Sequence, residues 1–517
     1  MKRRLIRKIL VANRGEIAVR IMRTCKELGI ATVAVYSDAD RLMPHVLMSD
    51  EAYPIGPAPS RESYLSTERI LNAANQSGAD AIHPGYGFLS ENATFAEAVT
   101  NAGIKFIGPS PDAIKAMGDK THARAMMSQA GVPVVPGTST PVVSLDAAYA
   151  FCEDQGFPVL IKAAAGGGGK GMRVVNSRDE FSSALRSAQS EAGSAFGDDR
   201  VYLEKYLQKP RHIEFQILGD EYGNIIHLGE RECSIQRRHQ KVVEETPSVI
   251  MDDVLRSEMG RTALRAAEAC GYFNAGTVEF LVDESRNFYF LEMNTRLQVE
   301  HPVTEMRTGI DLVAEQIRIA SGEPLVLKQP DVQFSGHAVE CRVYAEDVRN
   351  NFLPSTGTIL HLKPSEGFGV REDRGVEKGG EVSIYYDPMI AKLVAWGRSR
   401  NEALDRMRRA LREYEILGVE TTIPLSLFVI DHPLFRSGDF DTHFLENHWR
   451  PDSSLSALEP HEQMAAATLA AVLVEGSTER VITSVSPKDL VQPTDGFSGS
   501  HQAKKWKQQR SNVLRNR

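Results

Sequence analysis

The sequence predicts an α/β fold that begins with a parallel, doubly wound sheet. Residues 9–12 form a short apolar run typical of a buried strand, and residues 16–28 place apolar side chains on one helical face that ends at Gly29. Residues 31–36 and 80–83 then have the composition of further strands. Strands and helices that alternate in this way form a parallel sheet with helices on its faces.

The first candidate site positions follow from this topology. Residues 13–15 and 84–87 each come directly after a predicted strand. Binding sites in doubly wound sheets lie beyond the carboxyl ends of the strands. We therefore expect both segments to lie near a ligand.

Length and composition are those of a globular protein with several domains. The 517 residues exceed what one core usually supports, so we expect about two to four domains. The apolar content of 42% is ordinary, and a formal charge of −8 gives no case for nucleic acid or an anionic membrane as a partner. Five scattered cysteines without a C-x-x-C pair fit a reducing compartment. No long apolar segment follows the basic start, and the run at 464–474 is too short to span a bilayer, so we expect a cytoplasmic protein.

Changes in composition divide the chain into four regions. The third region is rich in short β segments and has a helical pattern near 401–414, and the fourth is rich in Pro, Ser, Asp and Thr. We expect one helix at 459–474. The last fourteen residues carry six bases and no acid, which is typical of a disordered tail, with partner docking as the alternative. The regions are residues 1–116, 117–321, 335–447 and 448–517.

A glycine run between two predicted strands points to a phosphate-binding flap. Residues 166–171 contain five glycines and follow an apolar strand that carries Lys162. Glycines let backbone N–H groups approach phosphate oxygens. Residues 172–175 have a strand pattern rather than the helix of a Rossmann fingerprint, and no Lys-Ser or Lys-Thr completes a Walker A motif. A hairpin flap over a nucleotide is therefore favoured over an ordinary surface hairpin.

A second predicted hairpin brings two carboxylates together. With Ser285 and Arg286 as its tip, Glu279 lies opposite Glu292, and Asn294 follows on the same face. Facing like charges destabilise a sheet unless a cation lies between them. Oxygen ligands without Cys or His select Mg²⁺ or Mn²⁺. The hairpin thus predicts a metal site, with a solvated acidic face as the alternative.

Polar residues alternate through the segment that follows this hairpin. An extended backbone places every second side chain on one face, which suits the wall of a site better than a core. We expect that face to carry Glu292, Asn294, Arg296, Gln298 and Glu300.

Three further charged segments leave their roles open. Residues 202–207 either hold an adenine edge or form an ordinary strand. A basic loop expected at 233–241 is either solvated or an anion site. Arg342 either pairs with an acid or points at a ligand, whereas His45 and His337 are expected to be structural.

Together these motifs resemble the biotin carboxylase family of the ATP-grasp superfamily. The match runs in order between about residues 5 and 447, through residues 12–18, 83–92, 117–120, 166–172, 236–241, 292–302 and 336–342. The resemblance implies a Rossmann-like N-terminal domain, a central ATP-grasp domain with a glycine-rich lid at about 134–206, and a β-rich C-terminal domain.

The resemblance also implies a role for each matching residue. Glu300 would be the general base and Arg342 the group that stabilises the biotin enolate, with Lys241 and Arg296 as further catalytic residues. The implied metal ligands are Glu279, Glu292 and Asn294. The implied ATP contacts are Lys120, Lys162, Gly167, Gly168, Gly169, Glu204, Lys205, Leu207, His212, Gln236, His239, Glu279 and Glu292. The implied bicarbonate and biotin contacts are Lys241, Arg296, Gln298, Val299, Arg342 and Tyr86.

The implied activity is ATP-dependent carboxylation of biotin by bicarbonate through carboxyphosphate, with Mg²⁺ or Mn²⁺. The chain has no Ala-Met-Lys-Met biotinylation motif and no carboxyltransferase region, so biotin is expected on a separate carrier protein, beside separate carboxyltransferase subunits. We expect a homodimer that serves acetyl-CoA carboxylase and fatty acid biosynthesis, with propionyl-CoA or pyruvate carboxylase as alternatives. Less favoured are an ATP-grasp ligase for another carboxylate and a non-catalytic nucleotide-binding protein.

Overall fold

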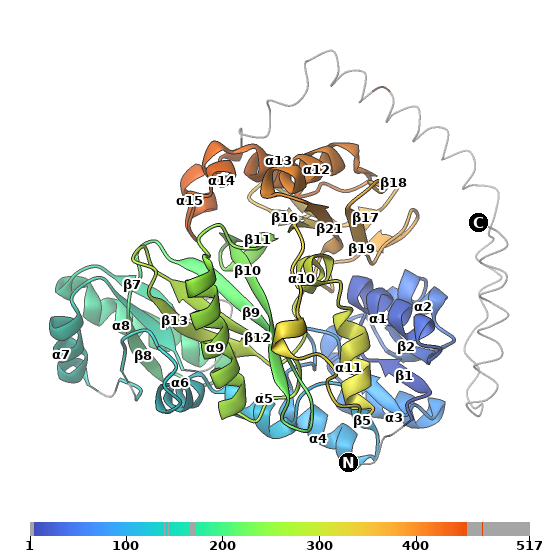
Figure 1. Ribbon diagram of the computed structural model, residues 1–517, viewed down its shortest axis with the longest axis horizontal. Coiled ribbons are helices and arrows are strands. Elements are labelled where there is room, and N and C mark those ends of the chain that lie inside the picture. Colours follow the sequence, from blue (N-terminus) through green and yellow to red (C-terminus); the bar gives the residue numbers. More distant parts are fainter. Residues whose placement is uncertain (1–4, 139, 143, 165–171, 452–467, 469–517) are drawn as a thin grey trace.

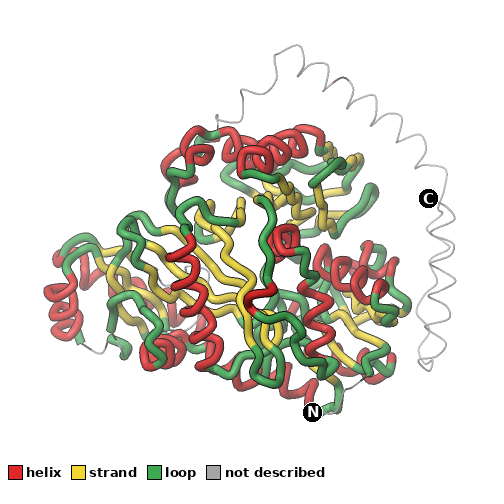
Figure 2. The backbone as a smooth tube through the Cα atoms, in the orientation of Figure 1, coloured by secondary structure: helices red, strands yellow, loops and turns green. Residues whose placement is uncertain are grey.

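The computed structural model describes residues 5–138, 140–142, 144–164, 172–451 and 468 (Figure 1). All but one residue of the helix predicted at 459–474, and all of the tail at 504–517, lie outside the described residues. Most helices lie on the outside of the strands (Figure 2). Within the described part of the chain, none of the helices combines the length and the apolar character that crossing a membrane requires.

The predicted N-terminal doubly wound sheet is confirmed. Its strands are all parallel and lie in the order β3-β2-β1-β4-β5. The strands are β1 (Lys8–Val11), β2 (Ala31–Ser37), β3 (Glu51–Gly56), β4 (Ala81–His83) and β5 (Lys105–Phe106). The helices that accompany them are α1 (Gly15–Glu27), α2 (Pro44–Met48), α3 (Thr67–Ser77) and α4 (Ala93–Asn101).

Alternate residues of β1 explain why helices cover both faces of this sheet. Ile9 and Val11 pack with apolar residues of α1 in one buried cluster. Leu10 points the other way and packs with Ile70 of α3 and Phe95 of α4 in a second cluster. A strand buried on both faces reads as a continuous apolar run, as this one does.

A small antiparallel sheet lies within residues 134–206, the region predicted to be the lid. Its order is β7-β6-β8, and β6 pairs with both neighbours. Two helices pack around the sheet, and two more precede it. These elements are α5 (Pro111–Gly118), α6 (Lys120–Gln129), α7 (Leu145–Gln155), β6 (Val159–Ala163), β7 (Arg173–Val175), α8 (Arg178–Phe196) and β8 (Val201–Lys205).

One antiparallel sheet of eight strands, in the order β13-β12-β9-β10-β11-β14-β21-β19, forms the middle of the molecule. It runs without a break across the boundary that the sequence suggested between residues 321 and 335, because β11 pairs with β14. The strands are β9 (Arg211–Gly219), β10 (Ile225–Arg237), β11 (Gln240–Thr246), β12 (Asn274–Val282), β13 (Phe288–Asn294), β14 (His337–Tyr344), β19 (Val370–Arg374) and β21 (Met389–Gly397).

Helices pack on both the central and the C-terminal parts of this sheet. Helix α9 packs on β10 and β9, α10 lies beside β14 and β21, and α12 packs on β21 (Figure 1). The helices are α9 (Asp253–Ala269), α10 (His301–Thr308), α11 (Leu312–Ala320), α12 (Arg400–Glu413), α13 (Ile423–Asp431), α14 (Pro433–Ser437) and α15 (Phe444–His448). Three two-stranded sheets complete the C-terminal region: β15 (Glu346–Asp347) with β16 (Leu353–Pro354), β17 (Gly357–Thr358) with β20 (Glu381–Val382), and β18 (His361–Lys363) with β22 (Glu415–Leu417).

Candidate active site

A cavity of about 860 Å³ opens among the N-terminal sheet, the large sheet and the C-terminal region. Its volume lies in the range of small-molecule binding pockets. Most of the predicted site residues line it: Tyr86, Lys120, Lys162, His212, Gln236, His239, Lys241, Glu279, Glu292, Asn294, Arg296, Gln298, Val299 and Arg342. The fold therefore gathers the predicted nucleotide, metal, bicarbonate and biotin residues into one site.

The β12–β13 hairpin places Glu279 directly opposite Glu292, as predicted, but by a different route. Asp283 donates its N–H to the carbonyl of Asn287 at 2.9 Å, so the turn is centred on Ser285, and Val282 lies opposite Phe288 rather than the expected Tyr289. A bulge at Leu291 then inserts one residue into β13 and restores the predicted pairing. The predicted tip was wrong, and Glu279 and Glu292 are opposite each other only because the bulge shifts the pairing by one residue.

The alternating segment is not one extended strand. β13 ends at Asn294, and Glu300 has φ −81° and ψ 14° just before α10. The expectation of a single strand face up to Glu300 is therefore wrong. The side chains still converge, because Arg296 donates to Gln298 Oε1 and to Asn294 Oδ1, both at 3.0 Å. Bends in the backbone, rather than the alternation of a strand, thus bring these polar side chains to one wall of the cavity.

Lys241 on β11 joins three carboxylates beneath the cavity. Its Nζ atom lies 2.5 Å from Glu214, 2.9 Å from Glu279 and 2.7 Å from Glu300. Burial alone would lower the pKa of Lys241, but the three carboxylates raise it well above its usual range. The lysine is therefore a fixed cation that stabilises negative charge at this point of the site.

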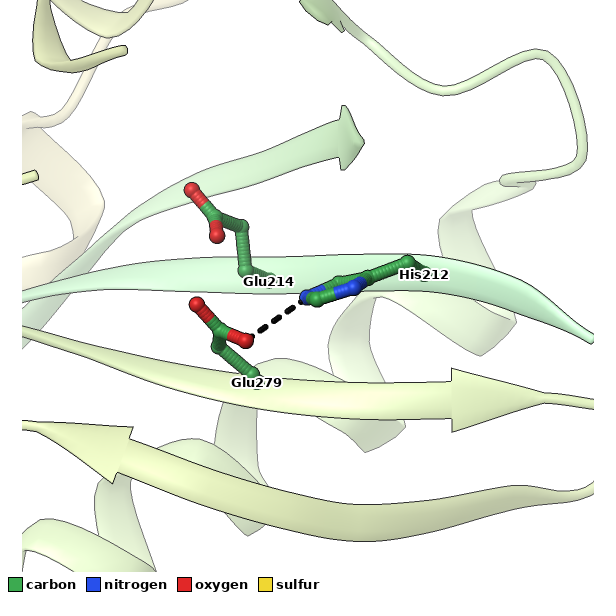
Figure 3. A group of neighbouring side chains, drawn as sticks. All are labelled: His212, Glu214 and Glu279. Carbon is green, nitrogen blue, oxygen red and sulfur yellow. Dashed lines mark ion pairs between the residues drawn. The ribbon is translucent and has the colours of Figure 1, made fainter. Parts of the chain in front are cut away.

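A histidine completes this buried group of charged side chains. His212 points from β9 toward Glu279 on β12, and Glu214 on the same strand keeps a carboxylate oxygen within 4.8 Å of both (Figure 3). Nε2 of His212 lies 2.8 Å from Glu279, and its Nδ1 accepts a hydrogen bond of 2.8 Å from Gln236. Burial raises the pKa of Glu279, but Lys241 and His212 outweigh it and hold that pKa well below its usual range. Glu279 is therefore ionised.

Glu300 is fully buried and lies between two cations. Its second carboxylate oxygen is 2.9 Å from Arg342, which also lies 2.6 Å from Glu244 on the neighbouring strand. Burial raises the pKa of Glu300, but Lys241 and Arg342 outweigh it and lower that pKa well below its usual range. Arg342 therefore pairs with acids, and because it also lines the cavity, its aim at a ligand stays a prediction.

At the opposite end, two lysines and two carboxylates lie together where the nucleotide is predicted to bind. Lys162 on β6 lies 2.9 Å from Glu204 on β8, and Arg124 lies 2.7 Å from the same carboxylate. Burial alone would lower the pKa of Lys162, but Glu204 raises it above its usual range. Lys120 is 3.4 Å from Glu292, which links this end to the hairpin. A cationic cluster of this kind suits the phosphates of a nucleotide.

The segment at 233–241 is a hairpin rather than the expected loop. β10 continues to Arg237 and β11 starts at Gln240, with Arg238 and His239 as the two turn residues at φ 49° and 67°. Two positive φ values fit a tight turn between twisted strands. The turn places both Arg238 and His239 at the cavity.

The side chains of the β12–β13 hairpin fit a divalent cation. Glu279 and Glu292 offer oxygens from opposing residues, and Asn294 is two residues further on. At present Asn294 turns its amide nitrogen to Glu279 at 2.8 Å and its oxygen to Arg296. A rotation of that amide would direct its oxygen to a cation. Hard oxygen ligands of this kind suit Mg²⁺ or Mn²⁺.

Several predicted residues lie away from the cavity wall. Lys205 is exposed and Leu207 half-buried, and neither they nor Glu204 are among the described residues that line the cavity. Glu300 lies behind the wall, where it contacts Lys241 and Arg342. The glycines predicted to hold phosphate, Gly167, Gly168 and Gly169, lie outside the described residues.

The structure adds residues whose role the sequence did not predict. Arg14 of the N-terminal region and Tyr386 of the C-terminal region both line the cavity, and the guanidinium carbon of Arg14 lies 4.2 Å from the ring centre of Tyr386. Arg231 is buried beneath the site and bonds to Glu214, and Glu91 lies 2.8 Å from Arg296. Two of them lie in segments that the sequence had singled out: Arg14 in residues 13–15, which follow β1, and Glu91 in the matched segment 83–92.

Comparison with protein families gives three matches in chain order. The description "Biotin carboxylase, N-terminal domain" matches residues 5–114. "Carbamoyl-phosphate synthase L chain, ATP binding domain" matches residues 119–328, and "Biotin carboxylase C-terminal domain" matches residues 340–447. These matches cover most of the described chain.

Individual relatives agree with the family matches. Biotin carboxylase 1 of Bacillus subtilis is 54% identical over 445 residues, which cover 86% of this chain and 99% of that protein. A pyruvate carboxylase subunit of Methanothermobacter thermautotrophicus is 56% identical over 444 residues, covering 86% and 90%. The biotin carboxylase domain dimer of Hydrogenobacter thermophilus 2-oxoglutarate carboxylase, solved with MgADP, ADP and bicarbonate, has a TM-score of 0.84 and 50% identity, and covers 88% of this chain and 100% of that one.

Proposed function

This chain belongs to the biotin carboxylase family of ATP-grasp ligases, which form a carbon–nitrogen bond, and we propose that it carboxylates biotin held on a separate carrier protein. The substrates are Mg-ATP, bicarbonate and biotin, and the products are ADP, phosphate and N1′-carboxybiotin. The observation that carries this proposal is Glu300, an ionised carboxylate held between Lys241 and Arg342 at the edge of a cavity with nucleotide-binding lysines at its other end.

Bicarbonate is a small anion and a poor nucleophile, so the site must hold it firmly. Arg296 and Lys241 supply the positive charge, with Gln298 and Val299 beside them at the cavity wall. Glu300 accepts the bicarbonate proton as general base. The oxygen so activated attacks the γ-phosphorus of ATP, which gives carboxyphosphate and ADP.

Lys120 and Lys162 bind the phosphates of ATP at the other end of the cavity, and Glu204, Lys205 and Leu207 contact the adenine. A divalent cation held by Glu279, Glu292 and Asn294 would neutralise charge that develops on the transferred phosphoryl group. Gln236, His212 and His239 complete the nucleotide side. Because Glu279 also contacts Lys241 at 2.9 Å, the metal side and the bicarbonate side share a residue.

Carboxyphosphate then divides into CO₂ and phosphate, and the phosphate takes the proton from the biotin ureido nitrogen. Arg342 stabilises the negative charge of the biotin enolate while N1′ attacks CO₂. Tyr86 lies beside biotin at the cavity wall. Exclusion of water is required because water would destroy both carboxyphosphate and the enolate.

The second half-reaction belongs to carboxyltransferase partners, and acetyl-CoA is the first acyl acceptor to test. Pyruvate and propionyl-CoA come next, since the relatives include the Methanothermobacter thermautotrophicus pyruvate carboxylase protein and a propionyl-CoA carboxylase alpha chain of Ruegeria pomeroyi. A homodimer is also part of the proposal, because the Hydrogenobacter thermophilus domain is a dimer.

The test is the release of ADP from Mg-ATP in the presence of bicarbonate, with and without free biotin. We expect ADP release to require bicarbonate and to rise with biotin. No stimulation by biotin at any concentration tested would contradict the proposed activity. Addition of purified carrier protein with each acyl acceptor and its carboxyltransferase then identifies the acceptor.

A further inference from the structure

A fully buried lysine lies on the same face of the large sheet as Arg342. Lys392 on β21 is 0% exposed. It is the direct cross-strand partner of Arg342 on β14, and Asp373 on β19 flanks it on the other side. Residues paired in this way share one face of a sheet. Lys392 therefore lies beside the group proposed to stabilise the biotin enolate.

The ammonium group of Lys392 reaches the backbone just before the general base. Its Nζ donates a hydrogen bond of 2.9 Å to the carbonyl of Val299. Glu300 follows directly, in a conformation that belongs to no strand, and α10 starts after it. The Lys392 bond thus fixes the peptide that joins Val299 to Glu300.

A neighbouring side chain holds the preceding carbonyl. Nδ1 of His301 lies 2.8 Å from the carbonyl of Gln298. Burial, together with the positive charge of Lys392, lowers the pKa of His301 well below its usual range, so the ring is neutral and has one N–H to donate. Two consecutive carbonyls, of Gln298 and Val299, are therefore held by buried side chains.

The buried ammonium also needs a counter-charge. Glu16 in the first turn of α1 lies 3.2 Å from Nζ, whereas Asp373 lies 4.0 Å away and already makes a bidentate pair with Arg371. Glu16 is therefore the nearest carboxyl group, and burial raises its pKa to about 7 against the opposing charge of Lys392. Glu16 connects the N-terminal helix to Lys392 in the C-terminal region, where α1, α10 and β21 meet (Figure 1).

From these contacts we infer that Lys392 is a positioning residue for the carboxylation reaction, with Glu16 as its counter-ion. It acts through the Val299 carbonyl, which sets the orientation of Glu300 relative to Lys241 and Arg342. This inference rests on the proposed function, since Glu300 is the proton acceptor there. It assigns a role in turnover to a lysine that touches none of the proposed substrates.

Three variants separate positioning from charge balance. Lys392→Met removes the donor and leaves Glu16 without a partner. The double variant Lys392→Met with Glu16→Gln removes both charges, so no lone buried charge is left to destabilise the fold. Lys392→Arg keeps a buried cation beside Glu16 but changes where its N–H groups point. Lys363→Met, at an exposed lysine that pairs with Glu415, is the matched control.

The measurements are kcat for biotin-dependent ADP release and the Kd of Mg-ATP, with circular dichroism to check folding. We expect kcat to fall about 100-fold in Lys392→Met and in the double variant, with the Kd of Mg-ATP within about threefold of the original. Lys392→Arg should retain more activity than either, and Lys363→Met should be unchanged.

Two outcomes overturn the inference. One is a double variant that regains activity within about threefold of the original, which would show that Lys392 only balances charge. The other is a folded Lys392→Met variant whose kcat is unchanged or falls only in proportion to its Mg-ATP affinity. If the unmodified protein releases no ADP in response to biotin, the proposed function itself fails, a result that the assay separates from the other two.

Discussion

Nζ of Lys241 lies 2.7 Å from Oε1 of Glu300, and the same ammonium group contacts Glu214 and Glu279. Three protons of the lysine therefore already face three carboxylates. An anion that binds Lys241 must compete with at least one of them. Under the proposed function, a divalent cation held by Glu279 would draw that carboxylate away and would leave one Lys241 proton for bicarbonate.

Removing the charge of Glu300 separates proton transfer from nucleotide binding. Glu300→Gln keeps the shape of the side chain but removes the base, so we expect kcat for biotin carboxylation to fall about 10²- to 10⁴-fold. The Kd of Mg-ATP should stay unchanged, because Glu300 faces Lys241 and Arg342 rather than Lys120 or Lys162. Glu284→Gln, at a side chain 70% exposed in the hairpin turn, is the control. Weakened nucleotide binding in Glu300→Gln would contradict the assigned role.

Arg342 offers a second test at the biotin end of the cavity. Arg342→Ala removes the cation beside the enolate, and a loss of about 10²- to 10³-fold in kcat is expected, with Mg-ATP affinity retained. Arg342→Lys keeps the charge but not the two-sided contact with Glu244 and Glu300, so it should recover only part of the loss. Equal activity of the Lys and Ala variants would show that charge at this point does not matter.

The hairpin carboxylates make a prediction that needs no turnover. Glu292→Gln removes one oxygen ligand from the pair formed with Glu279. We expect the affinity for Mn²⁺, measured in the presence of ADP by electron paramagnetic resonance, to fall at least about 10- to 100-fold. Because Glu292 also faces Lys120 at 3.4 Å, ADP affinity measured without metal serves as the control. A change in metal-free ADP affinity as large as that for Mn²⁺ would assign Glu292 to the nucleotide instead.

The sequence predicted most of the fold and most of the residues that line the cavity, but not the backbone geometry that brings these residues together. Apolar runs and helical periodicity were sufficient for the N-terminal sheet. The bulge at Leu291 was not predictable, because a strand with one extra residue keeps the same composition. The contact between Lys392 and Glu16 was not predicted either, because the two segments that carry them come together only in the folded chain. Local patterns identify which residues are polar, whereas tertiary contacts decide which of them meet.

Low pH should destabilise the contact between β11 and the C-terminal region, because Glu245 loses its charge there. This buried carboxylate lies 2.7 Å from both His337 and Arg400. Burial raises the pKa of Glu245, but His337 and Arg400 outweigh it and lower that pKa to about 2. The folded pKa is below the unfolded value of about 4.3, so the stabilisation is complete above that value and is lost as the pH falls toward 2.

Glu245→Gln should therefore cost about 3–5 kcal/mol at pH 7. The difference in urea midpoint between the variant and the original protein should stay constant down to about pH 5 and shrink below about pH 4. Glu415→Gln, in an exposed pair with His361 and Lys363, is the matched control and should cost much less. A difference that grows on acidification would contradict the assigned ion pair.

The backbone of Gly375 fixes how closely the C-terminal region approaches α1. A Cβ atom there would lie 2.4 Å from the nitrogen of Glu16 and 2.7 Å from the carbonyl carbon of Gly15. Since neither backbone atom can move aside freely, Gly375→Ala should lower the free energy of unfolding by about 1–3 kcal/mol. The shift would also displace Glu16 from Lys392, so kcat should fall while Mg-ATP affinity stays the same. Gly193→Ala in the last turn of α8, where the added atom meets only ordinary contact at 3.5 Å, should instead stabilise the protein by up to about 0.5–1 kcal/mol. Thermal unfolding of both variants checks the two opposite signs, and a Gly375→Ala protein as stable as the original would show that the two regions are free to separate at this contact.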